Sequence, residues 1–404
     1  MASPPTPTIL LLSLPQSCLC GIDLLSFTTS PRFQGIKSLP PGLHFTFTSS
    51  TSSSSLRHGV WFLVPPSPSH LIIKKWDTNN EQLTAEDNAV GVLRWKANIG
   101  SIWENGLTPY RQSSGETGAS ETEKGFVEEK QDWEQLVRNI TPALLGRITG
   151  GEANHWGFTS ASSSHVDEDV IPGLSERRTD GQHSERELRF LPIDLRKTWR
   201  EGAIGRERTE AAKDRSWALD NLIATHCSDA AEMEVIGEMQ VCFLMALILG
   251  NHSCLEQWKR ILELLLTCQA AVTTRPRLFK EVMWTLKLQL QHVGDVEGTG
   301  VFDVDGEGGG RVKTLLQTFG RSMKELGKQV KGEVRLQFED LEVWVKQELS
   351  WELGDEYLRK GMLELEDGER VEMEMDDLEA EDERGEYAPV VVDLEGNPIE
   401  SEFR

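Results

Sequence analysis

The chain has 404 residues, 38% of them hydrophobic, and a formal net charge of −23; at about 150 residues per domain it should form two or three domains. Nucleic-acid binding needs clustered Lys and Arg, and no such patch is visible, so we expect no direct nucleic-acid partner. An acidic chain is also repelled by anionic membranes, and no apolar run approaches the roughly 18–20 residues that span a bilayer. We therefore expect no membrane partner.

The first 75 residues predict β structure. Leu43–Thr48 alternates aromatic and polar side chains, and Val60–Val64 and Leu71–Trp76 are two further strand-like runs. The apolar start at Ile9–Leu14 is too short for a signal peptide and has no basic region before it, so we interpret it as a first strand. The Ser/Thr-rich stretch Ser49–Ser55 predicts a loop at a hairpin tip.

The spacing of apolar residues changes to that of a helix around Glu128–Ile148, where Pro142 predicts a kink or a break into two pieces. The segment that follows is rich in Ser, Gly, Asp and Glu and shows almost no apolar periodicity. We therefore predict a β-rich N-terminal domain with a terminal helix over residues 1–156 and a flexible linker over residues 157–186.

Residues 187–352 predict an all-α domain of short-looped helices. Glu232–Leu249 has a continuous apolar face and stops at Gly250-Asn251, a pair typical of helix C-termini. The next helix begins with Ser253-Cys-Leu-Glu256, which has the form of a capping box, and a third has Pro276 in its first turn. The remaining predicted features are a Gly/Asp-rich loop over Gly294–Gly310 and helices over Val312–Leu326 and Glu333–Leu349.

Residues 353–404 form an acidic tail that we predict to be disordered. From Trp351 to Arg404 there are 20 Asp and Glu against 5 Lys and Arg. Within the tail, residues 387–394 contain three consecutive Val and a Leu, which favour a strand and are costly to leave in water. The motif is a chance apolar patch, a strand on the protein's own sheet, or a linear motif that adds a strand to a partner's sheet edge; its composition does not separate these alternatives.

No constellation of catalytic or metal-binding residues stands out, so we predict no enzymatic activity, no cofactor and no metal site. Asp303-Val-Asp-Gly-Glu-Gly resembles the start of a calcium loop, but its twelfth position is Thr314 instead of Glu. The nine His form no HExxH pattern, and no GxSxG motif is present. The six Cys form no CxxC pair, which suits reduced thiols in a cytosolic or nuclear protein.

Several segments resemble the A1-cistron splicing factors, assembly factors of the U5 small nuclear ribonucleoprotein, and the tail motif fits the fungal branch of that family. The N-terminal signature combines the opening Ile9-Leu-Leu-Leu-Ser-Leu-Pro15 and Gly21-Ile22-Asp23 with a run from Phe33 through Lys37 into Pro40-Pro41-Gly42-Leu-His-Phe45. The family-like blocks in the C-terminal half and the tail are Asp214-Arg-Ser-Trp217, Glu238–Phe243, Gly250-Asn251, Glu256-Gln-Trp258-Lys259-Arg-Ile-Leu262, Leu288–His292 and Glu386–Asp393.

The resemblance implies a β-rich N-terminal domain, a helical stack similar to VHS-type modules, and no enzymatic activity. It also implies binding to the large scaffold protein of the U5 particle, through that protein's RNase H-like and Jab1/MPN-like domains. A monomer would then join other U5 components in a heteromeric complex, and hold off helicase and RNA during spliceosome maturation. A protein with this role should occur in nucleus and cytoplasm.

Under this interpretation, Val390, Val391, Val392 and Leu394 add a strand to the scaffold's sheet. The alternative function is a trafficking adaptor that binds sorting peptides through a VHS-type fold. Association with U5 components, as opposed to coat or endosomal proteins, would separate the two.

Overall fold

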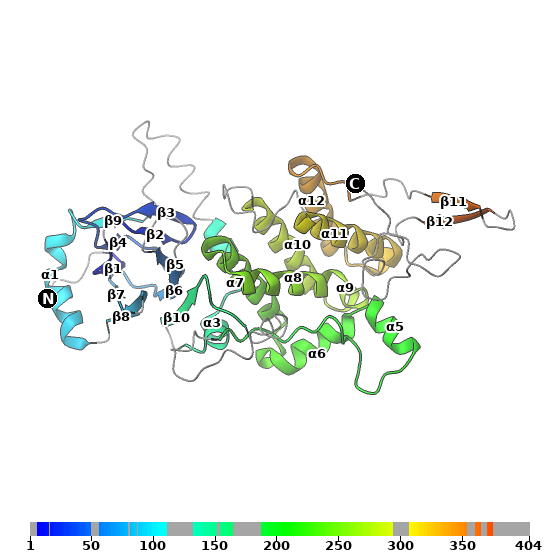
Figure 1. Cartoon of the computed structure of the whole chain (residues 1–404), viewed down its shortest axis with the longest axis horizontal. Helices are drawn as coiled ribbons and strands as arrows, with labels where there is room; N and C mark the ends of the chain where they lie inside the picture. Colours follow the sequence, from blue (N-terminus) through cyan, green and yellow to red (C-terminus); the bar gives the residue numbers. More distant parts are fainter. Residues whose placement is uncertain are drawn as a thin grey trace, which may run out of the picture. The chain divides into compact units, whose positions relative to one another are not determined.

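Strands come first along the chain and helices follow, as the sequence predicts, in the computed structural model shown in Figure 1. The structure describes residues 6–15, 17–49, 56–79, 81–86, 88–110, 132–151, 154–164, 187–293, 307–353, 360–364 and 370–374. Its contacts cluster the chain into two units, residues 1–344 and 345–404. The predicted domain boundaries at residues 186 and 352 stay predictions.

The N-terminal part contains two five-stranded sheets. The first has the order β8-β7-β1-β4-β9, and its strands are β1 (Thr8–Leu12), β4 (Gly35–Lys37), β7 (Leu71–Asp77), β8 (Gln82–Ala85) and β9 (Leu107–Pro109). The second has the order β10-β6-β5-β2-β3, and its strands are β2 (Leu19–Ile22), β3 (Leu25–Thr28), β5 (Gly42–Ser49), β6 (Arg57–Val64) and β10 (Trp156–Thr159). β1 runs parallel to β7, and β4 runs parallel to β9. The four strands expected from the sequence are confirmed as β1, β5, β6 and β7.

Apolar side chains fill both faces of the first sheet. Ile9 and Leu11 of β1 pack with Ile22 and Phe62 of the second sheet, so the main core lies between the two sheets. The alternate residues of β1 face the helix α1 (Ala89–Ile102). Because both faces are covered, the five residues of β1 are buried and read as a continuous apolar run.

Trp133, which lies in a helical turn at residues 132–136, packs on the outer face of the second sheet. Its ring stacks on Trp61 of β6 at 5.8 Å between centroids, and its indole N–H donates to the carbonyl of Leu43 at 2.9 Å. The predicted effect of Pro142 is confirmed as a break: α3 (Pro142–Thr149) begins at this proline, and Thr141 caps it. The missing N–H of a first-turn proline costs no helical hydrogen bond.

The predicted linker over residues 157–186 is wrong at its start, because Trp156–Thr159 forms β10 and pairs with β6. Trp156 and Phe158 are both buried, two residues apart on one face of the strand. Their alternation with Gly157 and Thr159 is a four-residue strand signal that the Ser- and Gly-rich composition around it hides. Residues 165–186 lie outside the described part of the chain.

The helical region is built around α7, whose residues from Val235 to Leu249 are buried. A helix that is apolar on all sides belongs in the centre of a helical stack, and α3, α8 and α10 all contact it. The helices of this region are α5 (Arg206–Lys213), α6 (Ser216–His226), α7 (Met233–Leu249), α8 (His252–Leu266), α9 (Ala270–Thr274), α10 (Pro276–Gln291), α11 (Glu307–Leu326) and α12 (Gly332–Glu348), with 3₁₀ turns at Ser228–Ala230 and Gly327–Gln329.

Two predicted helix ends in this region need correction. Gly250 ends α7 in the left-handed conformation, as expected, but Asn251 is the N-cap of α8 and accepts from the N–H of Cys254. Ser253, the predicted cap, lies inside the first turn and is buried. The loop predicted over Gly294–Gly310 ends earlier, because α11 begins at Glu307.

The second unit contains a small antiparallel sheet within the acidic tail. β11 (Lys360–Glu364) pairs with β12 (Arg370–Glu374), a hairpin that the acidic composition did not predict. The strand motif at residues 387–394 lies outside the described residues. Among the helices that the structure describes, none combines the length and apolar character needed to cross a bilayer.

Candidate functional site

The N-terminal signature residues meet around Asp23, at the turn between β2 and β3. Asp23 is fully buried and has a left-handed backbone, with φ of 55°. Its Oδ1 accepts from the N–H of Phe45 at 3.0 Å, and its Oδ2 lies 2.8 Å from Nδ1 of His44 and accepts from the hydroxyl of Tyr110. His44 Nε2 lies 2.9 Å from the carbonyl of Pro40. The carboxylate thus ties the turn to β5 and to the residue after β9, and His44 extends the network to the chain before β5.

This Asp–His–Tyr group combines residue types used in acid–base catalysis, yet its burial points to a positional role. The exposed fractions of Asp23, His44 and Tyr110 are 0%, 2% and 5%, so a substrate in solution has no access to them. A buried polar group with all partners satisfied fixes one arrangement of its neighbours. We interpret the network as the reason why the signature holds its shape.

The other signature residues support the same strands. A Cβ added to Gly21 would lie 2.0 Å from Cε1 of Phe47, so only glycine leaves room for that ring. Ile22 belongs to the core between the sheets, and Gly42 begins β5 with φ of 136°. Pro41 is exposed at the turn before β5. The structure therefore gathers the Gly-Ile-Asp and Pro-Pro-Gly parts of the signature around β5.

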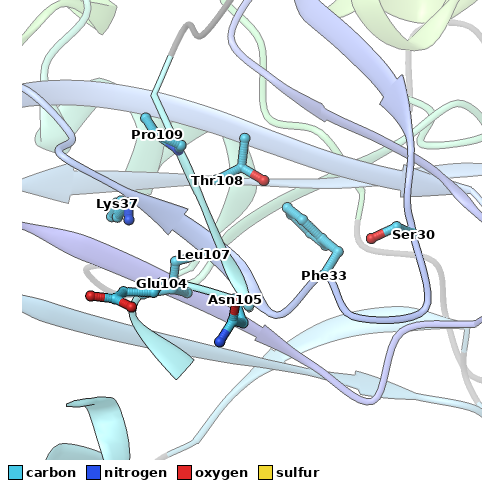
Figure 2. Close-up of a pocket in the computed structure, with 9 residues that line it drawn as sticks. Ser30, Phe33, Lys37, Glu104, Asn105, Leu107, Thr108 and Pro109 are labelled. Atoms are coloured by element: carbon cyan, nitrogen blue, oxygen red, sulfur yellow. The ribbon is translucent and has the colours of Figure 1, made fainter. Parts of the chain in front are cut away.

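A pocket of about 410 Å³ opens at the β9 edge of the first sheet (Figure 2). Two of its lining residues, Phe33 and Lys37, belong to the signature run. Figure 2 shows the Phe33 ring between Thr108 and Ser30. The residues that line the pocket are Ser30, Phe33, Lys37, Glu104, Asn105, Gly106, Leu107, Thr108 and Pro109. The Phe33 ring also packs edge-on against Phe27, with 5.3 Å between the ring centroids, and against the core between the sheets, so it joins the pocket wall to that core.

Lys37 lines this pocket, and its ammonium group is held in place by Trp103. Its Nζ donates to the carbonyl of Trp103 at 2.8 Å and lies 5.2 Å from the centroid of the Trp103 ring. The hydrogen bond and the cation–π contact join the end of α1 to β4. Lys37 therefore fixes one wall of the pocket in place and also gives that wall a positive charge.

In the helical region, the block that begins at Glu238 forms a second buried polar network. Glu238 is fully buried, and its carboxylate accepts from Arg147 at 2.6 Å, from the N–H of Leu191 at 2.9 Å and from Gln257 at 2.8 Å. Burial raises the pKa of the Glu238 carboxyl, and the guanidinium of Arg147 opposes this rise. The carboxylate joins α3, α7, α8 and the chain entering the helical region.

The two signature residues on α8 have different places. Trp258 is buried, donates from its indole N–H to Oε1 of Gln289 on α10 at 2.8 Å, and packs near Phe243 of α7. Lys259 is half-buried and pairs with Glu256 of the same helix at 3.0 Å. Trp258 therefore holds three helices together, whereas Lys259 pairs within its own helix.

Cysteine and metal chemistry are absent from these networks. The six Cys are free and buried, and burial raises the pKa of Cys20, Cys242 and Cys268, and that of Cys227 to about 11. Within the described ranges, no three His, Cys, Asp or Glu side chains are grouped so that they could hold a metal ion. The tail residues Val390, Val391, Val392 and Leu394 lie outside those ranges.

Comparison with known proteins assigns both parts of the chain to one family. Residues 5–150 match the AAR2 N-terminal domain, and residues 190–354 match the AAR2 C-terminal repeat region. The chain belongs to the AAR2 family. The resemblance seen in the sequence is thereby confirmed.

AAR2 relatives from distant organisms cover most of the chain. Protein AAR2 homolog of Homo sapiens is 24% identical over 321 residues, which cover 71% of this chain and 76% of the relative. The Caenorhabditis elegans homolog is 24% identical over 299 residues, covering 70% and 78%. The A1 cistron-splicing factor AAR2 of Saccharomyces cerevisiae is 22% identical over 286 residues, covering 68% and 74%.

Each AAR2 region contains one of the buried polar networks. Asp23 and its partners lie in the AAR2 N-terminal domain, and Glu238 and Trp258 lie in the AAR2 C-terminal repeat region. Arg147 of the first region reaches Glu238 of the second, so the two regions share a contact. β10 lies between the two matched ranges in sequence and completes the second sheet.

Proposed function

We propose that this chain is a non-catalytic assembly factor of the U5 small nuclear ribonucleoprotein. It binds the large U5 scaffold protein at its RNase H-like and Jab1/MPN-like domains, and it blocks premature engagement of helicase and RNA during maturation of the spliceosome. The observation that carries the proposal is AAR2 membership over residues 5–150 and 190–354, together with the yeast relative named as an A1 cistron-splicing factor. Such a factor acts in nucleus and cytoplasm.

Charge supports binding to a basic surface. The formal net charge is −23, and the segment from Trp351 to Arg404 holds 20 Asp and Glu against 5 Lys and Arg. A scaffold surface that meets RNA is basic, because it must neutralise phosphates. An acidic protein attracted to that surface excludes RNA by charge and by shape.

The tail motif supplies a second contact. Val390, Val391, Val392 and Leu394 add a strand to an exposed sheet edge of the scaffold, where main-chain hydrogen bonds give affinity. Residues 353–386 tether the motif to the helical region. The tether raises the effective concentration of the motif once the folded part has bound.

A competition experiment tests the proposal. The scaffold's C-terminal fragment is titrated with the full chain, with and without a labelled RNA that binds the fragment, at low and at physiological salt. The chain should displace the RNA, and its affinity should fall as salt screens the charges. A stable ternary complex of fragment, RNA and chain would contradict exclusion, and absence of binding would contradict the proposal as a whole.

A further inference from the structure

The outer side of α12 exposes two large apolar side chains. Leu336 is 67% exposed and Val343 is 55% exposed. They are seven residues apart, two turns of helix, and therefore lie on the same side. The inner side of α12 already packs into the helical core through Val334, Phe338 and Leu341, as the contact of Phe338 with Phe319 of α11 shows. The outer pair is thus apolar surface that packing within the helical region does not use.

The same side of α12 is acidic. Glu339 and Asp340 lie between the two apolar residues, and Glu333 lies one turn before Leu336. Glu333 and Asp340 pair with Lys280 and Lys287 of α10, but these are surface pairs that contribute little. Glu339 is exposed and adds a further negative charge at the centre of this face.

A second exposed apolar pair, on α1, has the opposite character. Val90 is 73% exposed and Leu93 is 48% exposed, and the neighbouring charges on that helix are Arg94 and Lys96. The two faces therefore present similar apolar area with charges of opposite sign. This contrast makes α1 a matched control for α12.

We propose that the outer face of α12, defined by Leu336, Glu339, Asp340 and Val343, docks a protein surface that combines Lys or Arg with an apolar pocket. The inference rests on the proposed function and names the part of the folded chain that meets the basic scaffold. The acidic residues lie between and beside the two apolar side chains, so one partner surface can meet apolar contact and negative charge together. Nucleic acid does not fit this face, because its phosphates are repelled by the acidic residues.

Chain connectivity supports the same partner. α12 leads directly into the segment from Trp351 to Arg404, which is the most acidic part of the chain. A basic surface that attracts this tail is therefore kept near α12 by a short stretch of chain, which raises its effective concentration at the helix. Charge steers the encounter, and the two apolar side chains contribute the burial that slows dissociation.

The test compares full-length variants for binding to the scaffold's C-terminal fragment. Leu336→Ser with Val343→Ser should weaken binding by about tenfold or more, because it removes two side chains from the centre of the contact. The matched pair Val90→Ser with Leu93→Ser on α1 should leave the affinity unchanged. All four positions are exposed, so equal melting temperatures would show that the variants are folded.

A second test separates the contribution of charge to association from the contribution of apolar burial to the stability of the complex. Glu339→Lys should weaken binding more at low salt than at high salt, whereas Glu325→Lys, at an exposed position on α11, should have no effect at either. Wild-type affinity in both the serine pair and Glu339→Lys would overturn the α12 proposal while leaving the proposed function intact. Failure of the wild-type chain to bind the fragment would contradict both. A concentration-dependent dimer that the serine pair abolishes would assign the face to self-association and also overturn the proposal.

Discussion

Asp23 occupies a hairpin turn with a left-handed backbone, and both of its carboxylate oxygens have partners inside the protein. An unpartnered buried polar group costs about 1–3 kcal/mol, so such a residue is retained only where its partners are in place. Glu238 follows the same rule in the helical region, with Arg147, Leu191 and Gln257 around it. Family resemblance at these positions thus reflects the geometry of the fold more directly than contact with a partner.

Gly21 gives a test of this rule in the signature. Replacing Gly21 with Ala places a Cβ 2.0 Å from the Phe47 ring, which must shift within the second sheet. We expect a loss of about 1–3 kcal/mol in the free energy of unfolding, measured with a chemical denaturant. Gly100→Ala is the matched control, because a Cβ at that exposed helical position meets nothing within 4 Å. The control should stabilise α1 by about 0.5–1 kcal/mol, and an equal effect of the two changes would refute the steric argument.

The Arg147–Glu238 pair predicts a pH dependence. Arg147→Met leaves a fully buried carboxylate without its cation, which should cost about 3 kcal/mol at neutral pH. Burial raises the pKa of the folded Glu238 carboxyl above the ordinary value of 4.5. At a pH between the ordinary pKa and the raised pKa of the folded state, Glu238 keeps its proton in the folded state and has lost it in the unfolded state. The free energy of unfolding therefore falls as pH rises through this range.

Loss of Arg147 raises the pKa of the folded Glu238 carboxyl further, because the cation that opposes the rise is gone. The penalty of Arg147→Met should therefore shrink as pH is lowered from neutral toward 4.5. Denaturant unfolding at several pH values measures this. Arg138→Met is the control, since Arg138 is 55% exposed in its pair with Glu281 and should change stability little at any pH. A penalty for Arg147→Met that does not vary with pH would rule out the ionised carboxylate as its cause.

At the scale of elements, local sequence patterns predict strands and helices well. They do not predict the role of a residue whose hydrogen-bond partners lie far away in the sequence. The alternation in Leu43–Thr48 and the apolar face of Glu232–Leu249 lead directly to β5 and α7. Asn251 is different, because its side-chain N–H groups donate to the carbonyls of Thr159 and Ser162, about 90 residues earlier in the chain. Nothing near Asn251 in the sequence indicates these partners, so the local pattern favours the capping box at Ser253.

The candidate site shows the same division. The resemblance located Asp23 and Phe33, but the pocket also needs Glu104–Pro109, which come from the turn after α1 and from β9. β9 has three residues and begins directly after a glycine turn, too short to give a periodic signal. Only the pairing of β9 with β4 places these residues beside the signature run.

Asn251 provides a test at this scale. Asn251→Ala removes the N-cap of α8 and both hydrogen bonds to the segment after β10, so we expect a loss of about 2–4 kcal/mol. Ser253→Ala, the cap that the sequence suggested, should cost about 1 kcal/mol or less, because Ser253 does not cap the helix. Unfolding in denaturant measures both. A larger loss for Ser253→Ala would show that the local capping box operates after all.

At the scale of the whole molecule, charge is distributed unevenly between the folded part and the tail. Residues 1–350 hold buried ion pairs and a nearly balanced charge, with 45 Asp and Glu against 37 Lys and Arg, whereas the tail holds 20 Asp and Glu against 5 Lys and Arg. Under the proposed function, the folded part would supply shape complementarity, and the tail would supply charge and an added strand.

This division predicts that binding and stability respond to different changes. Val391→Pro removes a backbone N–H from the tail motif and cannot continue a ladder of main-chain hydrogen bonds. The affinity for the scaffold fragment should fall by about tenfold or more, because the second contact of a linked pair is lost. The melting temperature should stay unchanged, since the buried networks around Asp23 and Glu238 lie elsewhere in the chain.

The control is Ala380→Pro, which places a proline in the tail but outside the motif. This change should leave the affinity intact. Equal weakening by both prolines would show that the tail acts through its charge and extension alone, and unchanged affinity in Val391→Pro would refute strand addition.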